Sequence, residues 1–280
     1  MNTTLPPLFV SHGSPMIALE PGEAGAFMQR LGPAISNTFG RPKAIVTVSA
    51  HTAARAPVVL AGARHEAIYD FGGFDPRLST LRYDAAGDPA LAQEILGLLD
   101  GAGIAAQAVP EGGLDHGAWT VLRFLFPSAD IPVVPLAFVP GDSPARQFAL
   151  GQAIAPLADR GVLILASGSI THNLRRVFAG GGLHPDKAQP EIAESAAFRR
   201  WFADRSAARD WAALLAYRAQ APHAVDMHPT DEHLLPWFVA AGAGGRDSAP
   251  RRIHDTVTMG SLGMDAYAFG PASTRLEVPA

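Results

Sequence analysis

The residues best placed for chemistry in this sequence are histidines that follow short apolar runs. His12, His51 and His172 each lie at or just beyond the end of a run with the composition of a buried strand. Imidazole nitrogens bind zinc, iron, copper and nickel, and a neutral imidazole transfers protons near pH 7. The placement therefore predicts metal binding or acid–base catalysis. His116, in a loop just before a helix, and His233, at the start of the last predicted helix, are further candidates.

The remaining histidines lack this placement. His65, His184 and His254 lie in polar loop contexts, and we predict that they stay outside any site. His223 and His228 lie shortly before the last predicted helix but follow no strand, so the sequence leaves their role open.

Three serines also end apolar runs, and a serine can act as a nucleophile. These are Ser11, Ser49 and Ser167, whereas Gly13-Ser14-Pro15 has the glycine spacing of neither a phosphate-binding loop nor a nucleophile elbow. Small residues are common where strands end, so the sequence disfavours a serine hydrolase.

The elements that position these side chains follow from the alternation of strand and helix patterns. Helices are predicted to open at Asp88-Pro89 and Ser143-Pro144, where a capping side chain precedes a proline, with Pro156 ending or kinking the second. Residues 191–215 are rich in helix patterns, and a last helix is expected from about Thr230 to the glycines near 242–245. Buried strands are predicted at 8–10, 44–48, 132–139 and 162–166, and a final strand at 263–269.

These patterns predict an α/β protein. We expect one three-layer α/β/α sandwich with a mostly parallel or mixed central sheet, and residues 1–280 as a single domain, since no repeat or linker divides them. In open α/β sheets, ligands bind beyond the carboxyl ends of the strands. The three strand-end histidines are therefore expected to converge on one place.

The composition limits which residue types can bind a metal and which partners are expected. The 280 residues include no cysteine, which excludes thiolate nucleophiles, Fe–S clusters and zinc–thiolate sites. Lys and Arg number 22 against 26 Asp and Glu, giving a net charge of −4, and no basic block marks a nucleic-acid surface. The first residues show no secretory signal, and no apolar stretch reaches the ~20 residues of a membrane span. We therefore predict a cytoplasmic protein that binds neither nucleic acid nor membrane.

Short strings along the whole chain resemble the class III extradiol ring-cleavage dioxygenases, and most closely the DOPA 4,5-dioxygenase type related to the protocatechuate 4,5-dioxygenase catalytic subunit. Each string is weakly specific, but together they occur in the family's order from residue 11 to about 270. They are Ser11-His12-Gly13-Ser14-Pro15-Met16, Val48-Ser49-Ala50-His51, Asp70-Phe71-Gly72-Gly73-Phe74, Asp115-His116-Gly117-Ala118-Trp119, Ser167-Gly168 to His172-Asn173-Leu174, Glu232-His233 to Pro236, and Gly260-Ser261-Leu262 with Met264. Many relatives carry an aromatic residue where this chain has Thr52.

The resemblance implies one non-haem Fe(II), often replaced by zinc in purified members. His12, His51 and His233 match the positions that hold the metal, and His172 matches a residue described either as a fourth ligand or as the acid/base. His116 matches a histidine beside substrate and oxygen. The implied reaction cleaves the ring of a catechol next to the diol with O2, giving a semialdehyde.

Several alternatives stay open at this point. The wider class uses two histidines and a glutamate, so Glu232 could replace its neighbour His233 at the metal. Adjacent helical residues point about 100° apart, so only one of the two is expected to reach it. A site made of histidines also suits a zinc-dependent hydrolase, and the fold suits a non-catalytic binding protein.

Overall fold

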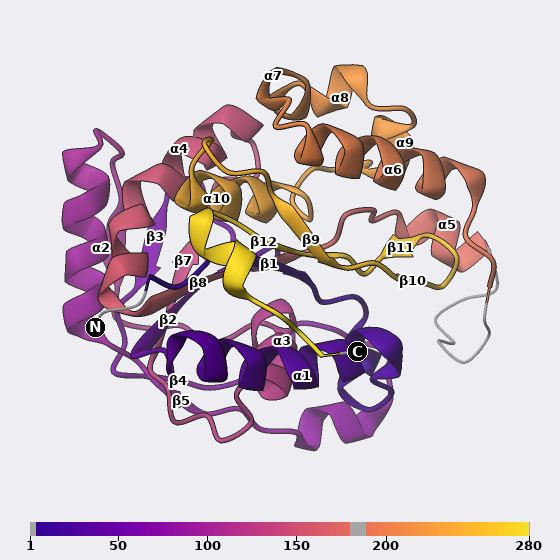
Figure 1. Ribbon diagram of the computed structural model, residues 1–280. Coiled ribbons are helices and arrows are strands. Elements are labelled where there is room, and N and C mark those ends of the chain that lie inside the picture. Colours follow the sequence, from indigo (N-terminus) through magenta and orange to yellow (C-terminus); the bar gives the residue numbers. More distant parts are fainter. Residues whose placement is uncertain (1–3, 180–188, 280) are drawn as a thin grey trace.

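The strands expected from the apolar runs lie in one central sheet of the computed structural model, which describes residues 4–179 and 189–279 (Figure 1). Within these residues the sheet has eight strands in the order β6-β3-β7-β2-β8-β1-β12-β9. Strands β7, β2, β8 and β1 run parallel. Strand β12 is antiparallel to both of its neighbours, β1 and β9, and β3 is antiparallel to β7. The strands are β1 Leu8–Ser11, β2 Ala44–Ser49, β3 Val58–Leu60, β6 Gln107–Val109, β7 Val133–Ala137, β8 Val162–Gly168, β9 Arg251–His254 and β12 Ala266–Ala268.

Helices cover both faces of this sheet. Figure 1 shows α1 and α3 on one side and α2, α4 and α10 on the other, with α6 to α9 grouped beyond them. The predicted three-layer α/β architecture with a mixed, mostly parallel sheet is confirmed. The helices are α1 Gly22–Phe39, α2 Pro89–Gly101, α3 His116–Leu125, α4 Pro144–Ile154, α5 Leu174–Ala179, α6 Ala193–Ala207, α7 Trp211–Leu215, α8 Tyr217–Gln220, α9 Ala224–Met227 and α10 Leu235–Gly244. Two small sheets pair β4 Arg64–His65 with β5 Ala85–Ala86, and β10 Val257–Thr258 with β11 Leu262–Gly263.

Local sequence signals account for the helix starts. The Asp88 side chain accepts a hydrogen bond from the Leu91 backbone N–H and so caps α2, and Ser143 caps α4 in the same way. Helix α4 ends before Pro156, as predicted, and the chain continues as a 3₁₀ helix over Ala155–Arg160.

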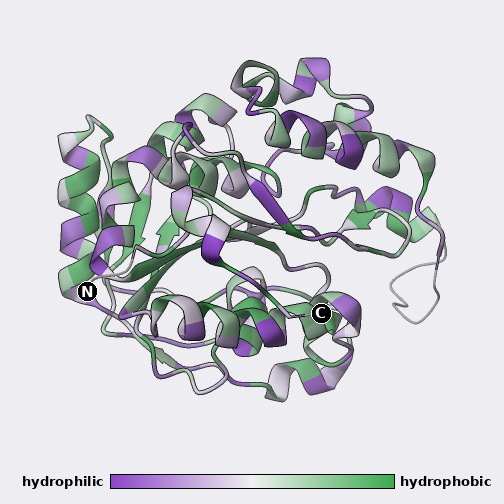
Figure 2. Ribbon diagram, in the orientation of Figure 1, coloured by the Kyte–Doolittle hydropathy of each residue, from purple (hydrophilic) through white to green (hydrophobic). Residues whose placement is uncertain are grey.

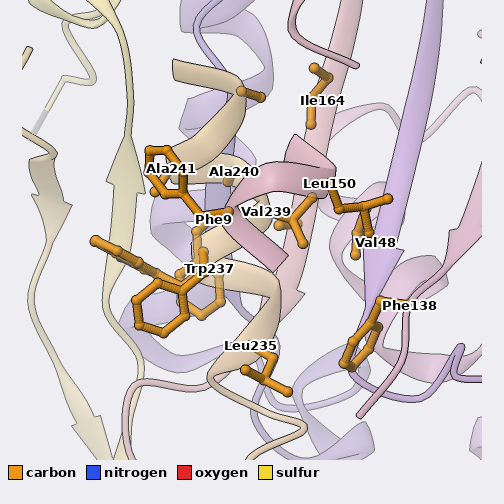
Figure 3. Close-up of a cluster of buried hydrophobic side chains, with 14 of the residues drawn as sticks. Phe9, Val48, Phe138, Leu150, Ile164, Leu235, Trp237, Val239, Ala240 and Ala241 are labelled. Carbon is orange, nitrogen blue, oxygen red and sulfur yellow. The ribbon is translucent and has the colours of Figure 1, made fainter. Parts of the chain in front are cut away.

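Apolar side chains from both faces of the sheet are buried, and the central strands stand out as hydrophobic in Figure 2. Helix α10 is buried on all sides, which suits its almost wholly apolar sequence. Figure 3 shows Trp237 and Val239 of this helix packed among side chains such as Phe9 of β1 and Ile164 of β8. The segment that leads into α10 is therefore joined to a helix that is fixed in the core.

Two glycines allow α10 to approach α4 closely. A Cβ at Gly151 of α4 would lie 1.9 Å from the Val239 carbonyl oxygen, and a Cβ at Gly242 of α10 would lie 1.9 Å from that of Phe148. Each helix thus presents a glycine where the backbone of the other passes.

Two predicted elements differ from the structure. The last helix begins at Leu235 rather than near Thr230, and residues 230–234 form a bend followed by a turn. Pro236 explains the later start, because proline is tolerated in the first turn of a helix but breaks the hydrogen bonds of its interior.

The final strand is also shorter than the predicted 263–269. Asp265 interrupts it, because its fully buried carboxylate accepts hydrogen bonds from Arg199 and Arg252. Its backbone oxygen accepts from Ser11. The single domain over residues 1–280 stays a prediction. None of the helices in the described part of the chain is long and apolar enough to span a membrane.

Candidate metal centre

The five candidate histidines line one cavity of about 440 Å³. Strands β2, β8 and β1 are parallel neighbours, so their carboxyl ends meet at one edge of the sheet. His12 directly follows β1, His51 follows β2 and His172 follows β8. The predicted convergence of these residues is confirmed. His233 reaches the same cavity from the turn before α10, and His116 reaches it as the first residue of α3, not from the loop before that helix.

The imidazole rings lie within direct contact of one another. The Nε2 atoms of His12 and His51 are 3.2 Å apart, and the ring centroids of His51 and His116 are 4.0 Å apart. His233 lies with its centroid 5.0 Å from that of His51 and stacks on His172 at 3.4 Å, with 9° between the planes. Imidazoles from several elements therefore meet in one cavity.

His12 is oriented by a hydrogen-bond chain. The Ser167 hydroxyl donates to the Gly117 carbonyl oxygen at 2.6 Å, so its own oxygen accepts from Nδ1–H of His12 at 2.8 Å. In the neutral ring this arrangement puts the proton on Nδ1 and leaves the Nε2 lone pair facing the cavity. His12 is 2% exposed. Its position and its tautomer both suit a metal ligand.

Gly117 is required by this arrangement. A Cβ at this position would lie 2.5 Å from the Ser49 hydroxyl and 3.0 Å from Nδ1 of His12. The residue after His116 must therefore lack a side chain for the start of α3 to approach β1.

A carboxylate orients His116 in the same way. Oδ1 of Asp70 accepts from the backbone N–H of His116 at 3.0 Å and from its ring Nδ1 at 2.9 Å. The second oxygen of Asp70 lies 3.7 Å from Nδ1 of His51. Burial alone would raise the pKa of Asp70, but the hydrogen bonds from His116 lower it below its ordinary value. Asp70 is therefore an anionic acceptor that leaves Nε2 of His116 facing the cavity.

Glu232 and His233 are not two alternatives on one helix. They lie in the turn before α10, so the 100° spacing expected for adjacent helical residues does not apply. Oε1 of Glu232 lies 3.1 Å from Nδ1 of His233 and accepts its hydrogen. The other ring nitrogen of His233, Nε2, is buried and bonds to no described residue. A buried nitrogen with a free lone pair is costly unless something else binds it.

The site favours neutral imidazoles. Burial, and next the neighbouring imidazoles, place the pKa values of His12 and His233 well below the ordinary 6.5. Burial, followed by His228, lowers the pKa of His172 to about 3. Neutral imidazole is the form that binds metal ions. At pH 7 the lone pairs are therefore available.

These donors fit a divalent metal ion. One nitrogen from each of His12, His51 and His116 lies within 4.8 Å of the others, and the same holds for one ligand atom each of His172, Glu232 and His233. Two facing Nε2 atoms and the unbonded Nε2 of His233 are the pattern expected where a cation supplies the missing partner.

With this geometry in place, the comparison with known proteins identifies the family. Residues 6–270 match the family described as "Catalytic LigB subunit of aromatic ring-opening dioxygenase". The chain belongs to this family.

Named LigB-family relatives match along nearly the whole chain. The protein called "4,5-DOPA dioxygenase extradiol" in Beta vulgaris is 35% identical over 268 residues, covering 93% of this chain and 95% of that protein. The protein of the same name in Escherichia coli (strain K12) is 36% identical over 271 residues, covering 96% of each. The crystal structure of an uncharacterized protein from Escherichia coli K12 is similar with a TM-score of 0.73 and 30% identity, covering 95% of this chain and 100% of that chain.

LigB membership makes this chain an oxidoreductase of the extradiol ring-opening class, whose reaction uses a catechol and O2. The expected resemblance to extradiol dioxygenases is confirmed. The hydrolase and the non-catalytic binding protein left open by the sequence are not what the family match supports.

The other described histidines lie outside this LigB-type site. His65 bonds the Gly112 carbonyl oxygen, and His254 stacks on Phe27 with centroids 4.3 Å apart. His228 is buried behind the cavity, where its Nε2 donates to the Ile170 carbonyl oxygen. His223 is exposed, and His184 lies outside the described residues.

Sequence reasoning missed the residues that orient the histidines. The sequence presents Ser167 as a candidate nucleophile and as part of a motif, and Asp70 as part of a motif, without indicating that either orients a histidine. Asp115 accepts hydrogen bonds from Ser49 and from Thr52, which fixes the loop that carries His51. The signal in the sequence was indirect, because Ser167 lies just after a predicted strand and Asp115 lies next to a motif histidine, whereas Asp70 has only its motif.

Proposed function

We propose that this chain is a non-haem Fe(II)-dependent extradiol dioxygenase that opens the ring of a catechol beside its two hydroxyls, with O2, to give a semialdehyde. We propose residues 1–280 as its single catalytic domain. The observation that carries the proposal is the convergence of five imidazoles on one cavity, with Nε2 of His12 and Nε2 of His51 only 3.2 Å apart. The cytoplasmic location stays a prediction from the sequence.

For the metal we propose His12, His51 and His233 as ligands, with His172 either as a fourth ligand or as the acid/base. The buried Nε2 of His233, which bonds to no described residue, supports its choice over His116. Zinc is the alternative occupant in purified protein, since imidazole binds both metals.

The metal content of two variants tests this choice. His233→Ala should lose the metal, whereas His116→Ala should retain it and lose turnover. The reverse result would assign the third ligand to His116, whose ring also lies within reach of His12 and His51.

The residues around the metal have different roles in the proposed reaction. A bound Fe(II) with open positions supplies Lewis acidity toward the catechol oxygens and a binding position for O2. His172, neutral at pH 7 and lining the cavity, is placed to accept the second hydroxyl proton of the catechol and to return it later. His116, held by Asp70, is placed to hydrogen-bond to the oxygen that adds to the ring. Phe71 and Leu174 give part of the cavity an apolar lining.

We take a DOPA-like or related catechol as the substrate because proteins named 4,5-DOPA dioxygenase extradiol are similar to this chain over most of its length. The test is oxygen uptake by protein reconstituted anaerobically with Fe(II) and mixed with a panel of catechols. One O2 consumed per ring-opened yellow product supports the proposal. Absence of uptake across the panel, with Fe(II) confirmed in the protein, contradicts it.

A further inference from the structure

A buried threonine joins the segment that carries His172 to the β10–β11 hairpin. Thr171 is 0% exposed. Its hydroxyl donates to the Ser261 carbonyl oxygen at 2.8 Å, and the same oxygen accepts from the Gly263 backbone N–H at 2.8 Å. The donor and an acceptor site of this hydroxyl are therefore both used on the hairpin, 90 and 92 residues farther along the chain.

The hairpin comes close to this segment because it has a glycine at the contact. A Cβ at Gly263 would lie 3.0 Å from Oγ1 of Thr171. The Ser169 hydroxyl is 2.7 Å from the Thr171 carbonyl oxygen and 3.1 Å from the Gly263 carbonyl oxygen. Residues 169–171 and the hairpin are thus joined by several hydrogen bonds among buried groups.

A second contact with the hairpin lies on the other side of His172. Val177 of α5 packs with Met259 and Leu262 in a small buried apolar cluster, and Figure 1 shows the hairpin beside α5. Leu262 also lines the site cavity, so the hairpin forms part of the cavity wall. His172 therefore lies between two contacts of its own segment with that wall.

The place of the His172 ring depends on its backbone. The ring stacks on His233 at 3.4 Å, and its nitrogens bond to no other described residue. The backbone before it is held by the Thr171 hydroxyl, and the Ser169 N–H donates to the His233 carbonyl oxygen at 2.9 Å. A change in these contacts would move the ring directly.

We propose that Thr171 is a positioning residue, whose hydroxyl sets where the His172 ring lies relative to the cavity wall at Leu262. This inference rests on the proposed function, because it gives His172 the role of proton transfer. Proton transfer requires the ring nitrogen to lie within hydrogen-bonding reach of the catechol oxygen, so a displacement of about 1 Å can lower the rate about 100-fold. His12 and His51 follow β1 and β2, so metal binding by these two residues does not depend on Thr171.

Two substitutions separate the hydroxyl of Thr171 from its shape. Thr171→Val keeps the branched shape but leaves the Gly263 N–H and the Ser261 carbonyl without this partner. We expect kcat of the Fe(II)-loaded protein to fall about 10–100-fold. Thr171→Ser keeps the hydroxyl and should retain most of the wild-type kcat. A lower kcat for the serine variant than for the valine variant would show that packing matters and not the hydroxyl, and would overturn the inference.

Metal content and catechol affinity distinguish positioning from damage to the site. Both are measured with the catechol that the wild-type protein turns over fastest, by elemental analysis and by calorimetric titration of the Zn(II)-loaded protein. Thr171→Val should match the wild type in both. Loss of metal, or a loss of affinity as large as the loss of kcat, overturns the inference. The matched control is Thr47→Val, the same change at a buried threonine of β2 outside the cavity lining, which should keep its kcat.

A double substitution tests whether Thr171 acts through His172. In the His172→Ala background, Thr171→Val should change the residual turnover less than about threefold, because the group that it positions is already absent. An equal loss in both backgrounds overturns the inference and leaves the proposed function standing. If Thr171→Val does not fold by circular dichroism, Thr171→Cys replaces it, with a smaller loss of kcat expected because a thiol is a weaker donor and acceptor. Absence of oxygen uptake by the wild-type protein with every catechol is the separate result that defeats the proposed function, and this inference with it.

Discussion

His12 and His172 follow neighbouring strands, β1 and β8, yet their rings are held in different ways. The His12 ring is tied by Nδ1 to Ser167, and Ser167 is tied to Gly117. The His172 ring forms no hydrogen bond with another described residue and lies flat on His233, although its backbone N–H is bonded to Met227.

The difference separates two tasks within one cavity. A ring whose second nitrogen has a fixed partner keeps one tautomer and one direction, which is what a metal ligand requires. A ring held by stacking keeps both nitrogens available, which is what a group that gains and loses a proton requires. The contrast supports our proposal of His12 as a metal ligand and, of the two roles proposed for His172, favours proton transfer.

The largest effect is expected from removal of the His12 ring, which is held by the hydrogen bond to Ser167. His12→Ala should reduce the metal content from roughly one ion per chain to almost none, because a three-histidine site loses one of its ligands. Elemental analysis after dialysis measures this directly. His223→Ala, at an exposed histidine outside the cavity, is the control and should keep its metal. Full metal content in the His12 variant would contradict the site.

Removal of the His172 ring, which stacks on His233, should lower turnover and leave the metal content unchanged. His172→Ala should lower kcat by about 10²–10⁴-fold, the usual contribution of a general acid or base, with the metal content unchanged. Steady-state oxygen uptake and elemental analysis of the same sample check both parts. Loss of the metal would make His172 a ligand, and unchanged turnover would remove it as the acid/base.

A smaller effect is expected from removing the hydroxyl that orients the His12 ring while the ring itself is kept. Ser167→Ala should weaken metal binding about 10–100-fold, because His12 loses the acceptor that fixes its tautomer. Competition with a chelator measures the affinity. Ser11→Ala is the matched control, since Ser11 ends the adjacent strand but donates to the Asp265 carbonyl oxygen rather than orienting a histidine. Equal losses in the two variants would mean that the effect is general destabilisation.

The smallest effect is a change in stability with pH, and it concerns His228, which is buried behind the stacked rings of His172 and His233. Burial lowers its pKa from 6.5 to about 4, so between these values the unfolded chain binds more protons than the folded chain. The free energy of unfolding of the metal-free protein should therefore fall as the pH drops below 6.5. His228 accounts for about 2 kcal/mol of this fall by pH 5.

Urea unfolding at several pH values measures this effect. His228→Gln keeps a donor for the Ile170 carbonyl oxygen and removes the titration, so its fall in stability between pH 8 and pH 5 should be smaller by that amount. An unchanged difference between pH 8 and pH 5 would exclude His228 as a contributor.

The sequence predicted the place of the site because strand ends are local features. Apolar runs ending before His12 and His51 are enough to place both at one edge of a parallel sheet. The orientation of the rings was not predictable in this way. Ser167 and His12 are 155 residues apart, and they meet only because the register pairs Val10 with Ser167 and Ser49 with Ser167 on either side of β8.

The apolar part of the cavity lining, which includes Phe71 and Phe178, could not be predicted for a related reason. Phe71 and Phe178 lie in segments without a periodic pattern, and each faces the cavity only because a loop and a short helix fold over the strand ends. Patterns in one segment reveal which face of an element is buried, but not which distant segment completes a pocket.

The close contact of α4 with α10 carries a consequence for genetics. Any side chain at Gly242 must push the two helices apart, because the Phe148 carbonyl oxygen occupies the place of its Cβ. Helix α10 begins two residues after His233, so the displacement would be passed along the chain to the ring that lies on His172. An allele that changes Gly242, a buried residue near the other end of that helix, would therefore lose activity in a screen as an active-site mutant does.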